Sequence, residues 1–84
     1  MNIYDYIATK IKQYSGDVAT IYDYNDTVVI DWQNYKLQIG EEGSRYIVIY
    51  DDEYGYETEI VVSKRNMKKF IDDLLDSIYP PRMM

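Results

Sequence analysis

Apolar side chains recur at helical spacing in two segments, one near each end of the chain. In residues 2–14 the side chains on one face are Ile3, Ile7, Ala8, Ile11 and Tyr14. In residues 64–78 the repeat is longer, and it runs through Met67, Phe70, Ile71, Leu74, Leu75 and Ile78. Spacings of three and four residues place such side chains along one stripe of an α-helix. We therefore predict an amphipathic helix over each range.

Residues at the ends of both ranges favour these limits. Asn2 suits the N-cap of the first helix, and Gly16 suits its C-terminal stop, where the backbone often turns left-handed. Ser63 is a suitable N-cap for the second helix, and Pro80-Pro81 prevents that helix from continuing. Residues 79–84 are then expected to form a tail.

Between the helices, in residues 18–62, the apolar repeat changes to two, which is the period of a strand with one buried face. Val28, Ile30 and Trp32 fall on one side of such a strand and Asp31 falls on the other. We interpret Trp32, at the end of this strand, as a core residue. The pattern predicts five strands, over residues 18–24, 27–32, 35–39, 45–50 and 56–62.

Short polar connections separate the predicted strands. They are Asn25-Asp26, Gln33-Asn34, a glycine-flanked loop at 40–44 and a turn at 51–55. Connections this short make neighbouring strands antiparallel. Residues 45–50 are apolar at almost every position, which is typical of a strand that is covered on both faces.

Together these elements predict an α+β fold in one small domain over residues 1–84. It consists of an N-terminal helix, a four- or five-stranded antiparallel meander and a C-terminal helix, with both helices on one face of the sheet in two layers. The other face is then bare, and it exposes one side of residues 45–50 together with Val29, Asp31, Glu57, Glu59 and Val61. A partly apolar, exposed sheet face commonly marks an interface.

The composition argues against most enzymes. The 84 residues include no His and no Cys, so the chain lacks the usual general base, thiol nucleophile and zinc ligands. No Gly-x-Ser-x-Gly motif and no glycine-rich phosphate loop occur. Asp51-Asp52-Glu53 offers carboxylates, but adjacent residues in an extended segment point in alternating directions, so we expect no metal site there. We predict no catalytic activity and no cofactor.

Charge points to a basic protein partner. Fifteen acidic residues against nine basic residues give a net charge of -6. Such a chain is repelled by nucleic acid and by anionic lipid, and it is attracted to basic surfaces. No apolar run approaches 18 residues, so no membrane span is expected. We predict a basic protein partner, no direct nucleic-acid binding and no membrane contact.

Eleven tyrosines accompany these acids, and tyrosine supplies rigid, amphipathic contact area at interfaces. Segments 21–26 and 49–54 both place carboxylates and tyrosine at the tip of a predicted hairpin. Glu57 and Glu59 follow on one strand face, about 6.7 Å apart given the rise of a strand. Carboxylates at this spacing could approximate a row of phosphates, of which a DNA strand carries one per roughly 3.4 Å of axis. The candidate partner-binding residues are Asp23, Asp26, Asp31, Asp51, Asp52, Glu53, Tyr54, Glu57 and Glu59.

Each of these acids also has a simpler interpretation. Hairpin tips are polar because water solvates them, and edge strands carry charge that prevents aggregation. A basic cluster, Lys64, Arg65, Lys68 and Lys69, lies at the start of the second helix, where the helix dipole favours acids. It could pair with Asp72 and Asp73 at i,i+4 spacing, or receive an anion.

The opening residues, Met1-Asn2-Ile3-x-Asp5-x-Ile7, and the lysine-bearing first helix resemble the start of some small acidic anti-CRISPR proteins of phages. The size, charge and predicted element order are similar as well. The resemblance implies a phage protein in the cytoplasm of a bacterial host that inhibits a CRISPR effector nuclease as a DNA mimic. It implies that the predicted hairpin and strand carboxylates act as phosphate mimics. The many tyrosines and the basic cluster depart from that pattern.

Three alternatives remain open at this point. An antitoxin or immunity protein that neutralises a basic toxin needs the same acidic, tyrosine-rich face. A structural phage protein could use the bare face to self-associate, for example as a homodimer. Nucleic-acid binding through the basic cluster is the third alternative, and the negative net charge opposes it.

Overall fold

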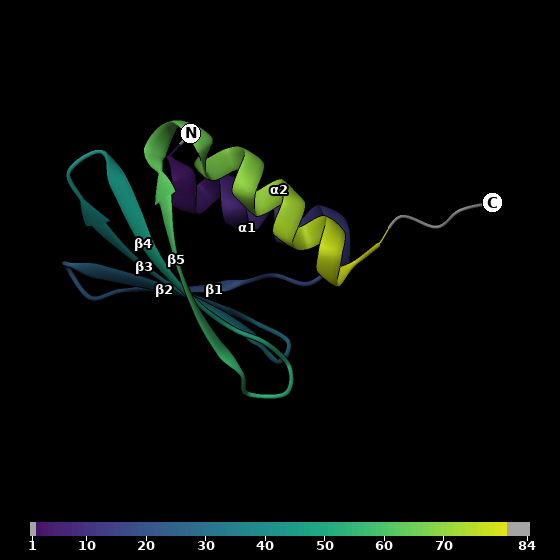
Figure 1. Cartoon of the computed structure of the whole chain (residues 1–84). Coiled ribbons are helices and arrows are strands. Elements are labelled where there is room, and N and C mark those ends of the chain that lie inside the picture. The colour runs from purple at the N-terminus through teal and green to yellow at the C-terminus, as the bar shows by residue number, and fades with distance from the viewer. Residues whose placement is uncertain (1, 81–84) are drawn as a thin grey trace.

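The structure has two helices, one near each end of the described residues, and a single antiparallel sheet lies between them in the sequence (Figure 1). The computed structural model describes residues 2–80. Its elements, in order, are α1 (Ile3–Ser15), β1 (Thr20–Asp23), β2 (Thr27–Trp32), β3 (Tyr35–Glu42), β4 (Arg45–Asp51), β5 (Glu57–Ser63), a 3₁₀ turn (Lys64–Asn66) and α2 (Met67–Ile78). The strands lie side by side in chain order, so the sheet is a five-stranded meander with β1 and β5 at its edges. The predicted α+β fold is confirmed.

Both helices lie on the same face of the sheet, where they pack against each other (Figure 1). The core between the layers contains fully buried residues from the two helices and from β2, β3 and β4. Those on the helices are Ile7, Ile11, Met67, Ile71 and Leu75. Those on the strands are Ile30, Leu37, Ile39 and Val48. These strand residues alternate with half-exposed or exposed ones, so the period-two pattern of the sequence corresponds to a sheet with one covered face.

The ends of α1 agree with the sequence. The side chain of Asn2 accepts a hydrogen bond from the backbone N–H of Asp5 at 2.8 Å, which satisfies one of the free donors at the helix start. Gly16 ends the helix in the left-handed region, at φ 81°, and its N–H donates to the carbonyl of Lys12.

The start of α2 differs from the prediction. Ser63 makes no side-chain cap, and its Oγ is buried without a hydrogen-bond partner among the described residues. A 3₁₀ turn over Lys64–Asn66 intervenes, so α2 begins at Met67. Because Ser63 is the last residue of β5 and pairs with Arg45, its position is set by the sheet rather than by the helix.

Two strand limits also differ from the prediction. Val18 and Ala19 precede β1 instead of belonging to it, and Val18 is 75% exposed. Gly40 lies inside β3, not in a loop, and it pairs with Thr27 and with Ile47. The turn between β3 and β4 is therefore only Gly43-Ser44, with Gly43 at φ 60°. A glycine within a strand gives the same sequence signal as a glycine in a loop.

The interpretation of residues 45–50 as a strand covered on both faces was wrong. Tyr46 and Val48 of β4 face the helices and are buried, but Ile47 and Ile49 lie on the other face and are only partly buried. No helix or loop of residues 2–80 covers that side (Figure 1). Ile47 and Ile49 therefore form part of an apolar surface and not of a second core.

The predicted tail is ordered at its beginning. The Tyr79 hydroxyl donates to Oε1 of Gln33 at 2.7 Å and accepts from Nε1 of Trp32 at 3.2 Å. Trp32 is 3% exposed and belongs to the core, as expected. Tyr79 thus ties the end of α2 to the turn between β2 and β3, while residues 81–84 of the predicted tail lie outside the described residues.

Candidate partner-binding surface

The side of the sheet that faces away from the helices, here called the bare face, collects four of the eight predicted acids. Cross-strand partners share a face, so the register defines its rows. In one row Asp31 lies beside Lys36, Lys36 beside Asp51, and Asp51 beside Glu57. Glu59 belongs to the next row, beside Ile49. The meander therefore brings together four acids that are up to 28 residues apart in the sequence, from Asp31 to Glu59.

This row keeps an excess of negative charge. Lys36 is its only cation, and its Nζ lies 3.7 Å from Oδ2 of Asp51. Asp51 and Glu57 are direct cross-strand partners, and like charges in that position destabilise a sheet. Asp51 is also more enclosed than the sequence suggested, since its side chain is 21% exposed and its Oδ1 has no hydrogen-bond partner within residues 2–80. Glu57 and Glu59, by contrast, are exposed.

An apolar area adjoins the acidic row on the bare face. Its core is a shallow hollow of about 200 Å³ lined by Thr27, Gln38, Gly40, Ile47 and Ile49. The hollow lies where Gly40 contributes no side chain between Thr27 and Ile47. Exposed Val61 and Tyr22 stand on the strands at its two sides. Sequence reasoning missed Gly40 and the hollow, although a glycine in a period-two segment is a signal of such a gap.

The tyrosines divide into two groups. Seven pack in or against the core, namely Tyr4, Tyr6, Tyr14, Tyr35, Tyr46, Tyr50 and Tyr79. The other four, Tyr22, Tyr24, Tyr54 and Tyr56, are between 44% and 78% exposed. Only this second group offers contact area to a partner, and only Tyr22 and Tyr24 of β1 and its turn stack on each other, with 6.3 Å between ring centroids. Most of the tyrosines therefore stabilise the fold and are not available to a partner.

The hairpin tip after β4 carries three of the predicted residues, Asp52, Glu53 and Tyr54. Oδ1 of Asp52 accepts the backbone N–H groups of Tyr54 and Tyr56, both at 2.9 Å. Asp52 therefore shapes the turn, as aspartate often does. Glu53 and Tyr54 are exposed and lie at the same end of the sheet as Asp51 and Glu57. Burial and the nearby charge of Glu53 raise the pKa of Tyr35, which packs against the core, so Glu53 lies toward the helix side and outside the acidic row.

Asp23 and Asp26 are not part of this surface. They belong to the hairpin between β1 and β2, at the opposite end of the meander from the 52–56 turn (Figure 1). Oδ1 of Asp23 accepts the N–H of Asn25 at 3.0 Å, so this acid also shapes a turn. Asp23 alternates with Tyr22 and so lies on the helix side of β1. The predicted residues thus form two separate groups.

Two of the four cations of the basic cluster, which spans the 3₁₀ turn and the start of α2, pair with carboxylates of the protein. Lys64 contacts Oε2 of Glu41 at 2.9 Å, and Lys69 contacts Oδ2 of Asp73 at 3.0 Å, the i,i+4 pair that the sequence suggested. The hydrogen bond between Lys64 and Glu41 raises the pKa of the lysine and lowers that of the carboxyl. The nitrogen of Lys68 lies 5.2 Å from the ring centre of Tyr6. Lys64 and Lys69 are therefore neutralised by carboxylates, whereas Arg65 and Lys68 form no ion pair with a described residue.

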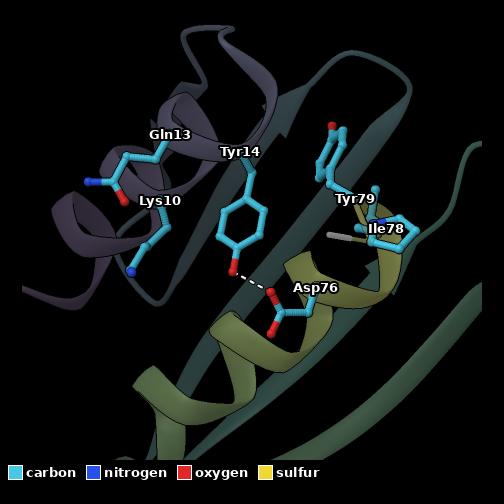
Figure 2. A pocket seen from close by; sticks show the side chains of 7 residues that line it. Lys10, Gln13, Tyr14, Asp76, Ile78 and Tyr79 are labelled. Carbon is cyan, nitrogen blue, oxygen red and sulfur yellow. Dashed lines mark hydrogen bonds between the residues drawn. The ribbon is translucent and has the colours of Figure 1, made fainter. Parts of the chain in front are cut away.

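A second concave region lies on the helix side (Figure 2). It has a volume of about 770 Å³ and is lined by Lys10, Gln13, Tyr14, Asp76, Ile78, Tyr79 and Pro80. Figure 2 shows the Tyr14 hydroxyl donating to Asp76 across the gap between the helices. Tyr79 is bound to Gln33, and Lys10 lies 3.8 Å from Asp72. Because Tyr14, Asp76, Tyr79 and Lys10 already have partners within the protein, this hollow is a weaker candidate for binding than the bare face.

Several tyrosines have a raised pKa because they are buried or contact a carboxylate. Burial and the charge of Glu41 raise the pKa of Tyr4 to about 12. The hydrogen bond to Asp76, with burial, raises the pKa of Tyr14 to about 12. Burial raises the pKa of Tyr50 to about 12 as well. In the unfolded chain these hydroxyls ionise near pH 10.

The folded state therefore binds more protons than the unfolded state between pH 10 and about 12. A state that binds fewer protons gains relative stability as pH rises, so we expect the free energy of unfolding to fall as the pH is raised above 10. Urea denaturation at a series of pH values measures this loss. Tyr14→Phe removes one titrating group and is expected to make the fall less steep, and an unchanged slope would contradict the assignment.

The described residues offer neither a metal site nor a membrane span. Within residues 2–80 no group of three acidic side chains converges closely enough to hold a metal ion. Neither α1 nor α2 has the length and apolar character that crossing a bilayer requires.

Comparison with known proteins adds no relative. No protein-family model, no curated protein and no solved structure matches this chain. The resemblance of the opening residues to anti-CRISPR proteins therefore stays a prediction.

Proposed function

We propose that this protein is a non-enzymatic inhibitor that binds a basic, nucleic-acid-binding protein through the bare face and competes with nucleic acid there. One observation carries the proposal: the meander gathers Asp31, Asp51, Glu57 and Glu59 in adjoining rows beside an apolar hollow that nothing in residues 2–80 covers. Charge around an apolar centre is the usual composition of a protein interface.

The two parts of the bare face would act differently. Exposed carboxylates such as Glu57 and Glu59 attract Lys and Arg over a distance and raise the association rate. The hollow around Gly40 and the exposed Val61 side chain supply area that packs in the complex and slows dissociation. Arg side chains of the partner can also lie over the exposed ring of Tyr22. Added salt should weaken the complex, because it screens the charges.

A guide-loaded CRISPR effector nuclease is the first target class to test, since the resemblance of the opening residues implies it. The same surface would serve an antitoxin that faces a basic toxin, and the identity of the captured protein distinguishes the two. Self-association through the bare face is less favourable, because it would bring the acidic rows of two copies together.

A pull-down tests the proposal. The tagged protein is mixed with guide-loaded effector nucleases and, in parallel, with basic toxins, and DNA binding by each captured protein is then measured. We expect a complex that dissociates as salt is raised and that excludes DNA. A complex that forms equally well at high salt, or one that leaves DNA binding intact, would contradict the proposed mechanism.

A further inference from the structure

We infer that β5 is a docking strand, which accepts an extended basic segment of the partner as a sixth strand of the sheet. This inference deepens the proposed function and rests on it, because the segment belongs to the same basic partner. It names the part of the surface where the partner's backbone binds, which the charge of the bare face alone does not.

The hydrogen bonds of the hairpin show which backbone groups of β5 are free. The N–H of Asp52 donates to the carbonyl of Tyr56 at 3.0 Å, and the N–H of Lys64 donates to the carbonyl of Ser44 at 2.9 Å. The register between these two bonds is continuous, so even-numbered residues of β5 point their backbone groups at β4. The N–H and C=O groups of Glu57, Glu59 and Val61 then point outward, and within residues 2–80 no strand lies beyond them.

The two edges of the sheet differ in their capacity to pair. β1 has four residues, and only Ile21 and Asp23 point their backbone groups outward, since Tyr24 bonds to Thr27 of β2. β5 has seven residues in unbroken register with β4 and contains no Pro and no Lys. Short edges and edge lysines or prolines prevent unwanted pairing, and β5 has none of these. Its only charges are the carboxylates of Glu57 and Glu59, which oppose pairing with an acidic strand but not with a basic one.

Charge selects the occupant of this edge. The side chains of Glu57 and Glu59 stand on the bare face, and each would lie directly beside a side chain of an added strand. Neither forms an ion pair with a described residue. Lys or Arg at alternate positions of an incoming strand would pair with both. A second copy of this chain brings a net charge of -6 and no cation within its own β5.

The other face of an added strand also finds a complementary surface. A groove of about 380 Å³ lies between β5 and α2 on the helix side, lined by Val62, Asn66, Lys69, Phe70 and Asp73. Residues between the basic positions of the incoming strand would point to this side. Val62 and Phe70 favour apolar side chains there. The expected segment thus alternates Lys or Arg with apolar residues. In such strand addition the backbone hydrogen bonds give affinity and the side chains give specificity.

The test uses the whole protein, labelled for amide detection, and a synthetic peptide that alternates Lys with Val. We expect the peptide to protect the amides of Glu57, Glu59 and Val61 from exchange. Val61→Pro removes one outward N–H and spares the bonds to β4, because an edge strand tolerates proline at such a position. It should weaken peptide binding roughly fivefold to tenfold, as the loss of a backbone hydrogen bond predicts. Val61→Thr changes the same side chain but keeps its branched shape and the N–H, so it is the reference for the side-chain change. We expect the Pro variant to bind several-fold more weakly than the Thr variant.

Equal binding by the Pro and Thr variants would overturn strand addition. If Val61→Pro does not fold, a peptide with N-methyl groups on the amides that face β5 replaces it, and unchanged binding of that peptide would overturn the inference too. Protection of β5 without peptide, together with a dimeric mass in solution, would replace the basic segment by a second copy. Binding that is lost in Glu59→Lys but kept in Val61→Pro would leave the proposed function standing without strand addition. A protein that binds no basic protein or peptide would refute both.

Discussion

Replacing Glu59 with Lys is expected to slow association with the basic partner roughly tenfold or more at low salt. Glu59 is exposed, belongs to the bare face and forms no ion pair with a described residue, so its charge is free to act on an approaching partner. The substitution should change the free energy of unfolding by less than about 0.5 kcal/mol relative to the parent protein, as most surface substitutions do. Association kinetics measured with the captured partner across a range of salt concentrations give the result.

Asp5→Lys is the matched control. It changes the net charge by the same amount, but Asp5 is exposed in the first turn of α1 and lines neither the hollow of the bare face nor the groove beside β5. Loss of an acid at the start of a helix costs about 0.3–1 kcal/mol. We expect its association rate to stay close to that of the parent. Equal slowing by both variants would mean that overall charge, and not the bare face, attracts the partner.

Replacing Ile39 with Ala is expected to reduce the free energy of unfolding by about 2–5 kcal/mol. Ile39 has no exposed surface and lies on β3 between Val28 and Val48, under the helices. The change leaves a cavity that the surrounding core fills only in part. A chain of 84 residues has a total stability of roughly 4–13 kcal/mol, so this single change removes a large share. Urea denaturation followed by circular dichroism measures it.

The same deletion on the other side of the sheet should act differently. Ile47 lies on β4, beside the position of Gly40, on the bare face and only partly buried. Ile47→Ala should cost clearly less stability than Ile39→Ala, and it should weaken partner binding because Ile47 lines the hollow. If Ile47→Ala lost as much stability as Ile39→Ala and bound the partner normally, the two faces would not have the separate roles proposed.

Much of the fold follows from local patterns that the sequence displays. The i, i+3, i+4 repeat from Met67 to Ile78 and the alternation around Leu37 can each be satisfied by only one kind of element, and both predictions are confirmed. Gly16 and Asn2 cap α1 through contacts with residues three or four positions away. Such features depend on near neighbours, so one sequence is enough to predict them.

What the sequence could not predict depends on distant partners. Ile47 and Ile49 suggested a strand buried on both faces, because an apolar interface and a core have the same composition. Asp23 and Glu57 were both predicted to bind the partner, yet the meander places them at opposite ends of the sheet and on different faces. Seven tyrosines pack in or against the core, and the sequence could not separate them from the exposed ones because their contacts, such as that of Tyr6 with Asp72, join residues far apart in the chain.

Oxidative footprinting of side chains, with and without the captured basic partner, tests the central claim most directly. Hydroxyl radicals modify exposed side chains on both layers, so one experiment compares the bare face with the helices. We predict that binding protects Tyr22, Ile47 and Val61 and leaves Tyr14 and Leu74 as reactive as before. Protection of Tyr14 and Leu74, with Tyr22, Ile47 and Val61 unchanged, would contradict the bare face as the docking surface.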